Sequence, residues 1–248
     1  MNVLLKKIGR RLLPLTVRRR ILRLTRWPPV GRVRFGSLRR LRPISADWGG
    51  DRGRPIDRFY IERFLAQNRS DIQGQVLEIG DNSYTRAFGR ERVTQSDVLH
   101  VADQEPPVTI MGDLTAAHHI ATGSFDCVIL TQTLQTIYNV GAAISTVERI
   151  LKPRGVVLAT VPGISKISRY DMDHWGYYWS FTSASARRLF AGVFPEANVQ
   201  VEAYGNVLTS IAFLHGLAVE ELKPHELEAK DPDFEMLITI RAVKAAGE

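Results

Sequence analysis

The sequence of 248 residues contains one cysteine, Cys127. A single cysteine excludes an intramolecular disulfide and a zinc or redox site of the CxxC type. The histidines show no H-E-x-x-H spacing, so no metal is predicted. No uninterrupted apolar run approaches the roughly 18 residues that span a bilayer, and arginines interrupt any apolar signal-peptide core near the N-terminus. We therefore expect a cytoplasmic protein.

Acidic side chains are scarce in the N-terminal part of the chain. Residues 1–54 carry 16 Lys and Arg but only Asp47 and Asp51, a net charge of +14. Because the whole chain has a formal net charge of +7, the remainder carries −7. The sequence therefore divides into a basic N-terminal arm, residues 1–50, and a second domain, residues 51–248.

The arm mixes aliphatic residues with Lys and Arg, as in MNVLLKKIGRRLLPLTVRRRILRLTRWPP. Such a basic, partly amphipathic segment suits an anionic membrane surface, with aliphatic side chains in the interface and cations against lipid phosphates. It suits packing on its own domain or on a partner equally well. Nucleic acid is disfavoured, because the arm lacks the interleaved aromatic residues of a base-stacking surface. Residues 1–45 are thus a candidate for peripheral contact with the inner face of the membrane.

The rest of the sequence alternates short apolar segments with amphipathic ones. Strands are expected within 75–80, 92–98 (ending at Asp97), 107–114, 124–134, 156–162, 198–205 and 234–244. Helices are expected within 56–68, 84–89, 140–155, 184–194 (capped by Ser183 or Ser185) and 207–217. This alternation predicts an α/β, Rossmann-like doubly wound fold with a mostly parallel sheet of seven strands. The last two strands come late in the chain, which suits an antiparallel edge.

Glycine is scarce in the loop that follows the first strand. In VLEIGDNSYTRAFG, residues 76–89, Asn82 and Thr85 stand where a dinucleotide-binding loop has further glycines after Gly80. Asp81 would repel a phosphate, so NAD and FAD are disfavoured. Asn tolerates a left-handed backbone, and a cofactor without phosphates needs no close approach to the main chain. The loop can therefore bend without hosting a pyrophosphate.

Polar residues follow the expected strand ends. Gly80 ends the first strand, Asp97 the second and Asp113 the third, and Thr131 and Gln132 end the fourth. In an open parallel sheet, ligands bind beyond the carboxyl ends of the strands. We expect these residues to meet at one edge of the sheet.

From about Gly53 to Lys244 the sequence resembles the class I S-adenosylmethionine-dependent methyltransferases, in the broad group found with bacterial glycan and glycosyltransferase genes. The matching segments are VLEIG at 76–80, Asp97, GDL at 112–114, FDCVILTQTLQTI at 125–137, ERILKPRGVVLATVP at 148–162 and WGYYWSFTSASARRLF at 175–190. Their order and spacing together carry the resemblance, since each segment alone is common.

The resemblance implies S-adenosylmethionine as the cofactor. Glu78 and Gly80 would shape the pocket for its methionine part, and Asn82 belongs to the same bend. Asp97 would accept hydrogen bonds from the two ribose hydroxyls. The alternatives are that Asp97 caps the next turn and that Glu78 is an ion-pair partner at the strand end.

The resemblance also implies how the adenine would be held. Asp113 would accept from its amino group, and Leu114 would pack on the ring. Thr131 and Gln132 would line the floor between the cofactor and the acceptor. Asp113 also suits a turn cap, as Asp97 does.

The acceptor would bind near the aromatic segment GISKISRYDMDHWGYYW, residues 163–179. Methyl transfer requires alignment of the acceptor with the methyl group, and a hydroxyl acceptor also requires a base. His174 is the preferred base, since its ordinary pKa near 6.5 suits proton transfer around neutrality. Asp171 or Asp173 would orient or replace it. The aromatic residues suit stacking on sugar faces, or a packed lid without a catalytic part.

The sequence thus favours a methyltransferase that forms an O-methyl group on a sugar of a cell-surface glycan or a related small metabolite. One alternative is a non-catalytic binding module that recruits itself to a membrane or a glycan-assembly complex through the arm. Another is a nucleic-acid methyltransferase. The acidic charge of the second domain and the lack of an N-P-P-Y or D-P-P-Y motif disfavour that last alternative.

Overall fold

The computed structural model describes residues 14, 16–17, 28, 30, 32–102 and 108–247. It divides into two units, residues 1–42 and residues 43–248. In the first unit the described residues form one turn of 3-10 helix, η1 (Gly36–Leu38). Most of the predicted arm, and with it most of the candidate membrane segment 1–45, lies outside the described residues. Within the described residues, no helix has the length and apolar character to cross a membrane.

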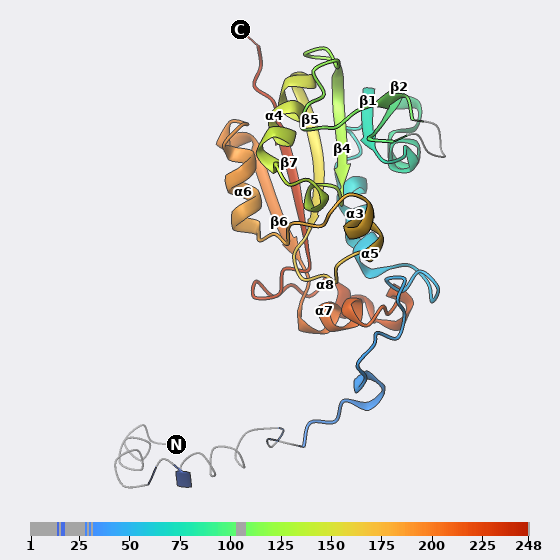
Figure 1. The fold of residues 1–248 in the computed structure, drawn as a ribbon, viewed down its shortest axis with the longest axis vertical. Coiled ribbons are helices and arrows are strands. Elements are labelled where there is room, and N and C mark those ends of the chain that lie inside the picture. Colours follow the sequence, from blue (N-terminus) through green and yellow to red (C-terminus); the bar gives the residue numbers. More distant parts are fainter. Residues whose placement is uncertain are drawn as a thin grey trace. The chain divides into compact units, whose positions relative to one another are not determined.

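The second unit is built on one sheet (Figure 1). The described residues form seven strands: β1 (Gly74–Ile79), β2 (Val93–His100), β3 (Ile110–Met111), β4 (Phe125–Thr131), β5 (Leu151–Pro162), β6 (Val199–Tyr204) and β7 (Leu237–Val243). Their order across the sheet is β3-β2-β1-β4-β5-β7-β6. Strands β1 to β5 pair in parallel, and β7 runs antiparallel to both β5 and the edge strand β6. The predicted fold class is confirmed.

Helices cover both faces of this sheet. The described α-helices are α3 (Ile56–Gln67), α4 (Val140–Ile150), α5 (Arg169–His174), α6 (Ser183–Ala191), α7 (Val207–Leu214) and α8 (Pro224–Glu228). The other helical segments are the π-helical η2 (Thr85–Gly89) and the 3-10 turns η3 (Arg90–Arg92), η4 (Leu134–Thr136), η5 (Glu196–Asn198) and η6 (Val219–Glu221). Helices α4 and α6 contribute to one hydrophobic core, whereas α3, α7 and α8 contribute to a second core.

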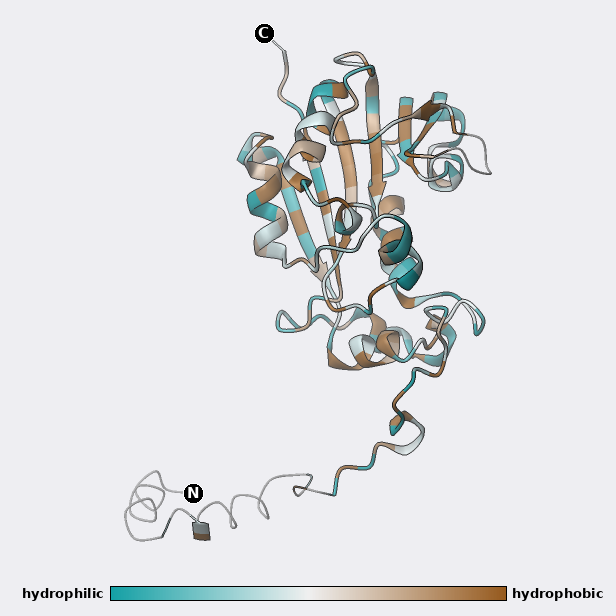
Figure 2. Ribbon diagram, in the orientation of Figure 1, coloured by the Kyte–Doolittle hydropathy of each residue, from teal (hydrophilic) through white to brown (hydrophobic). Residues whose placement is uncertain are grey.

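The strands supply both cores because successive side chains of a strand point to opposite faces. Leu77 and Val128 lie in the core of α4 and α6, whereas Val76 and Ile129 lie in the core of α3 and α7. Figure 2 shows the hydrophobic colouring that results along the central strands. The single cysteine, Cys127 of β4, is fully buried in the second core, and this burial raises the pKa of its thiol.

Several predicted boundaries are wrong. Strand β2 continues three residues past Asp97, to His100. Strand β5 begins at Leu151, five residues earlier than expected. Neither Ser183 nor Ser185 is the N-cap of α6: Thr182 accepts from the backbone N–H of Ser185, and the Ser185 hydroxyl accepts from the N–H of Thr182.

Strand order places a topological switch point at the middle of the sheet. From β1 the chain goes outward to β2 and β3, and it then returns to β4 on the other side of β1. Loops on the two sides therefore leave the sheet in opposite directions above the carboxyl ends of β1 and β4. Open α/β sheets bind their ligands in the crevice that this reversal creates.

Candidate active site

Two cavities lie at this switch point. Cavity A, of about 790 Å³, extends over the ends of β1 and β2 and past residues 112–115 to α5. Cavity B, of about 760 Å³, lies between the start of α3, the bend after β1 and the segment that leads into α5. The two cavities share four lining residues, namely Ile79, Thr131, Gln132 and Asp171.

The bend after β1 opens onto cavity A through Gly80. This residue has a φ of +93°, and an added Cβ would meet no atom within 4 Å. Asp81 stabilises the bend by accepting from the N–H of Ser83 at 2.7 Å. Asn82 lines neither cavity and donates from Nδ2 to the Ser96 hydroxyl at 3.2 Å. The structure therefore brings Gly80 to the site but not Asn82.

Glu78 holds the bend from below. Its side chain is 2% exposed, and it accepts from the N–H of Tyr84 at 3.2 Å and from the N–H and hydroxyl of Thr85, each at 2.7 Å. Burial raises the pKa of Glu78 to about 7, against the lowering effect of these hydrogen bonds. Glu78 lines cavity B and forms no ion pair within the described part of the chain. It acts on the site by fixing the backbone of residues 80–85.

The structure does not bring Asp97 to the site. Because β2 runs on to His100, Asp97 lies inside the strand and lines neither cavity. Its carboxylate accepts from Gln95 Nε2 at 2.7 Å and from the Thr109 hydroxyl at 3.0 Å. The expected position of Asp97 at the strand end is wrong. His100, the last residue of β2, and Val101 after it line cavity A instead.

Asp113 and Leu114 both line cavity A. Asp113 accepts from the N–H of Thr115 at 2.8 Å through Oδ1, so it caps the turn as the alternative interpretation proposed. No described residue donates to its other carboxylate oxygen, Oδ2. Leu114 is 3% exposed and packs in the core below the cavity. Capping the turn therefore leaves one oxygen of Asp113 for a ligand.

Thr131 and Gln132, at the end of β4, line both cavities. Gln132 has a φ of +48°, which costs a non-glycine residue about 1–2 kcal/mol. Its N–H donates to the Thr160 carbonyl at 2.9 Å, and its own carbonyl accepts from Gln135 Nε2 at 2.6 Å. Backbone strain of this kind is typical of functional sites.

Helix α5 brings two of its three candidate residues to the cavities. Asp171 lines both, and His174 lines cavity A only. His174 Nδ1 lies 2.7 Å from the Tyr170 carbonyl. Because a carbonyl only accepts, Nδ1 carries the proton and the lone pair of the neutral ring is on Nε2. Asp173 lines neither cavity and is ion-paired with Arg169 at 2.7 Å.

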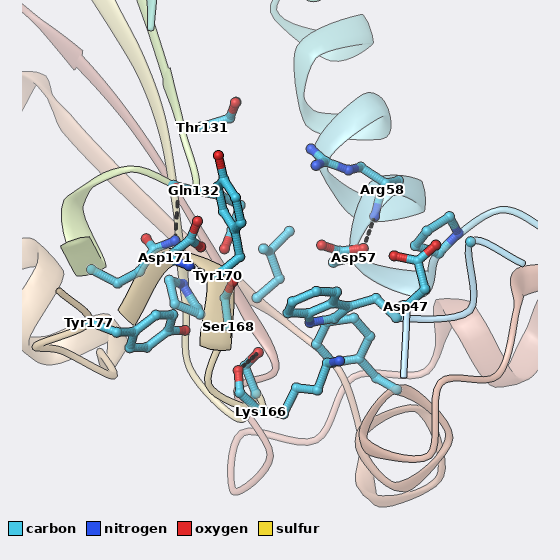
Figure 3. A pocket seen from close by; sticks show the side chains of 18 of the residues that line it. Asp47, Asp57, Arg58, Thr131, Gln132, Lys166, Ser168, Tyr170, Asp171 and Tyr177 are labelled. Atoms are coloured by element: carbon cyan, nitrogen blue, oxygen red, sulfur yellow. Dashed lines mark hydrogen bonds between the residues drawn. The ribbon is translucent and has the colours of Figure 1, made fainter. Parts of the chain in front are cut away.

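Cavity B contains charged residues that the sequence did not single out as site residues. Figure 3 shows Asp47, Asp57 and Arg58 on one side of the cavity, and Tyr170 and Asp171 on the other. Asp57, next to Arg58 at the start of α3, could have been noticed in the sequence, because an acidic residue in the first turn of a helix lies at the positive end of the helix dipole. Lys166, Ser168 and Tyr177 also line the cavity. No group of three or more His, Cys, Asp or Glu that suits a metal ion occurs within the described residues.

Comparisons with known proteins agree with this architecture. Residues 64–159 match the protein family described as "Methyltransferase domain". A stretch of 77 residues is 29% identical to probable polyketide synthase 10 of Dictyostelium discoideum, covering 31% of this chain and 3% of that much longer protein.

Two solved structures share the fold at low sequence identity. A SAM dependent methyltransferase from Archaeoglobus fulgidus has a TM-score of 0.52 at 12% identity, covering 75% of this chain and 94% of its own. The [4+2]-cyclase SpnF has a TM-score of 0.50 at 15% identity, covering 78% and 83%. Residues 64–159 therefore match a methyltransferase domain, the chain shares the fold of these two solved structures, and S-adenosylmethionine is the cofactor that the family match supports.

Proposed function

We propose that the protein transfers a methyl group from S-adenosylmethionine to a hydroxyl group of a sugar, in a cell-surface glycan or a related small metabolite. One observation carries this proposal. Cavities A and B have similar volumes and share Ile79, Thr131, Gln132 and Asp171. A nucleoside in cavity A and an acceptor in cavity B would meet at these four residues.

The residues present fit the cofactor. The bend at Gly80 leaves open the space that a Cβ would fill, so a ligand can approach the backbone there. Beyond it, Leu114 offers an apolar surface for a ring and Asp113 an acceptor for an amino group. When bound, the cofactor supplies a methyl group on a positively charged sulfur.

The chain's own residues would then orient the acceptor and take its proton. Asp171 lies at the boundary of the two cavities, so its carboxylate is the group that we assign as the general base. His174 lines cavity A, and its neutral ring has a free lone pair on Nε2. It would therefore accept a proton from the side of the site that holds the cofactor. Asp173 lines neither cavity and has no part in this mechanism.

The location follows from the same proposal. The second unit would work in the cytoplasm, and residues 1–45 would hold it at the inner face of an anionic membrane through their Lys and Arg side chains. This contact would place the active site near glycan precursors.

Titration with S-adenosylhomocysteine tests the cofactor part, and incorporation of label from methyl-labelled S-adenosylmethionine into sugar tests the transfer. We expect saturable binding and labelled sugar. If S-adenosylhomocysteine does not bind at millimolar concentration, the protein is a non-catalytic binding module instead. Label in RNA or DNA but not in sugar would favour the nucleic-acid methyltransferase.

A further inference from the structure

Cavity B is rich in groups that accept hydrogen bonds. Asp47, Asp57, Asp81 and Asp171 contribute four carboxylates from four separate segments of the chain. Asp47 and Asp57 lie on one side of the cavity and Asp171 on the opposite side (Figure 3). In the part of the chain that the structure describes, no donor contacts the carboxylate oxygens of Asp47 or Asp171. Asp57 accepts from the N–H of Arg58 at 2.8 Å through Oδ1, and burial raises its pKa.

The two cations of this cavity are already engaged. Arg58 donates from Nη1 to the Tyr84 hydroxyl at 2.8 Å. The negative charges of Asp57 and Asp81 attract its guanidinium. Lys166 donates to the carbonyl of Ala46, and its ammonium lies 3.6 Å from the centroid of the Trp48 ring. A ligand in cavity B therefore meets more carboxylates than free cations.

An uncharged group in the same cavity also lacks a donor. The Gln135 side chain is 3% exposed, it lines cavity B, and its Oε1 has no hydrogen-bond partner. Its Nε2 donates to the Gln132 carbonyl, which fixes the amide orientation because a flip would set two acceptors against each other. A buried acceptor without a partner is costly, so a ligand that donates to Oε1 removes that cost.

The cofactor does not remove this excess. The amino-acid part of S-adenosylmethionine carries one ammonium and one carboxylate, and its sulfonium adds one positive charge but donates no hydrogen bond. One ammonium donates at most three hydrogen bonds. Asp47, Asp171 and Gln135 come from separate segments, so one ammonium does not supply donors to all of them.

We infer that cavity B takes a sugar that bears a protonated amine, and that it rejects sugars bearing a carboxylate or phosphate. The inference rests on the proposed function and narrows its acceptor to amino sugars. Hydroxyl and ammonium groups supply the donors that Asp47 and Gln135 Oε1 lack, and an ammonium adds a positive charge beside the carboxylate of Asp57. An anionic group would instead lie among these carboxylates at a cost. Asp171 remains available to the hydroxyl that is methylated.

The test is a titration of the full-length protein saturated with S-adenosylhomocysteine, so that the cofactor site is filled first. The probes are matched triplets of sugars: glucosamine, glucose and glucuronate, and the same three forms of galactose and mannose. In at least one series we expect the affinity for the amino sugar to exceed that for the neutral sugar by about ten-fold or more. The uronate should bind more weakly than both, and added salt should reduce the preference.

Two variants and one control locate the effect. Asp47→Asn combined with Asp57→Asn should reduce the affinity for the amine to that for the neutral sugar. Gln135→Met should weaken the amine and the neutral sugar by a similar factor, because it removes an uncharged acceptor. Asp173→Asn removes a nearby carboxylate that lines neither cavity, and it should leave all sugar affinities unchanged.

Each outcome separates this inference from the proposed function. If S-adenosylhomocysteine binds but no amino sugar binds better than its neutral counterpart, the inference is wrong and the methyltransferase proposal stands. If a uronate binds best in every series, cavity B selects anions and the inference is wrong. If S-adenosylhomocysteine itself does not bind, the proposed function fails first. Unchanged affinity for S-adenosylhomocysteine in each variant shows that the variant is folded.

Discussion

Glu78 and Thr85 are joined by two hydrogen bonds of 2.7 Å, one from the backbone N–H of Thr85 and one from its hydroxyl. Both end on the same buried carboxylate oxygen, and they tie the strand end to the turn η2 across the bend. The bend thus keeps its shape with glycine at position 80 alone. The hydrogen bonds to this buried carboxylate fix the shape of the bend, whereas a phosphate-binding loop depends on several glycines.

The first prediction concerns the protonation of Glu78. Its pKa is about 7 in the folded protein and ordinary, near 4.3–4.5, in the unfolded chain. The folded state therefore binds this proton more tightly, so the associated stability is fully present below about pH 4 and is lost as the pH rises through about 7. Relative to Glu78→Gln, which does not titrate, the free energy of unfolding of the wild type should fall by about 3 kcal/mol over this range. Denaturant unfolding at both ends of the range measures it, and a constant difference would contradict the prediction.

The second prediction concerns Gly80→Ala. The φ of +93° should cost the variant about 1–2 kcal/mol of unfolding free energy without a clash, since the new Cβ meets no atom within 4 Å. The methyl group also enters cavity A, so affinity for S-adenosylhomocysteine should fall. Gly123→Ala is the matched control: φ is +70°, its Cβ also meets nothing within 4 Å, and it lines neither cavity. It should lose stability but keep full affinity.

The third prediction separates two aspartates at strand β2 and after β3. Asp113→Ala should weaken binding of S-adenosylhomocysteine by about 1–3 kcal/mol, because it removes an acceptor from cavity A. Asp97→Ala should leave that affinity unchanged and lower only stability, through its lost bonds to Gln95 and Thr109. Isothermal titration of both variants decides the matter. If Asp97→Ala binds S-adenosylhomocysteine more weakly than the wild type, the ribose site includes Asp97 of β2.

The fourth prediction concerns the base. Asp171→Asn should reduce methyl transfer to the sugar acceptor by about 10²-fold or more, with unchanged affinity for S-adenosylhomocysteine, if the carboxylate takes the acceptor proton. His174→Gln should have a smaller effect, and Asp173→Asn none. Initial rates with methyl-labelled cofactor give the comparison. A larger loss in His174→Gln than in Asp171→Asn would reassign the base.

The fifth prediction concerns the arm. Residues 43–248 form a compact unit by themselves, so deletion of residues 1–42 should leave cofactor binding intact. The same deletion removes 14 Lys and Arg and should abolish a salt-sensitive association with anionic vesicles. Co-sedimentation with anionic and neutral vesicles measures the association. Equal binding of the intact chain to both kinds would argue against a membrane role.

The sheet was predictable because its strands are apolar runs separated by amphipathic helices, a local pattern that survives in the fold. The end of β2 was not, because it depends on a long-range contact. Leu99 and His100 extend the strand by pairing with Ile110 and Met111 of β3. That pairing moves the strand end away from Asp97, and only the apolar residues after Asp97 hinted at it.

The rule that ligands bind beyond strand ends predicted some of the residues that line cavity A, namely Gly80, Asp113, Thr131 and Gln132. Cavity B did not follow from this rule, since one of its walls comes from the segment that precedes helix α3. Ile44 and Ser45 donate to the carbonyl of His215, which seats this segment at the end of α7 and brings Asp47 to the cavity. Such a contact between distant parts of the chain has no periodic signature in the sequence.

The buried position of Cys127 makes the protein convenient for spectroscopy. Its thiol is enclosed in the core and its pKa is raised, so the reactive thiolate is scarce and shielded from reagents. A cysteine introduced on the surface of α5 would therefore be the sole target of a maleimide dye or spin label. One substitution is thus enough to report motions of that helix during ligand binding, without prior removal of Cys127.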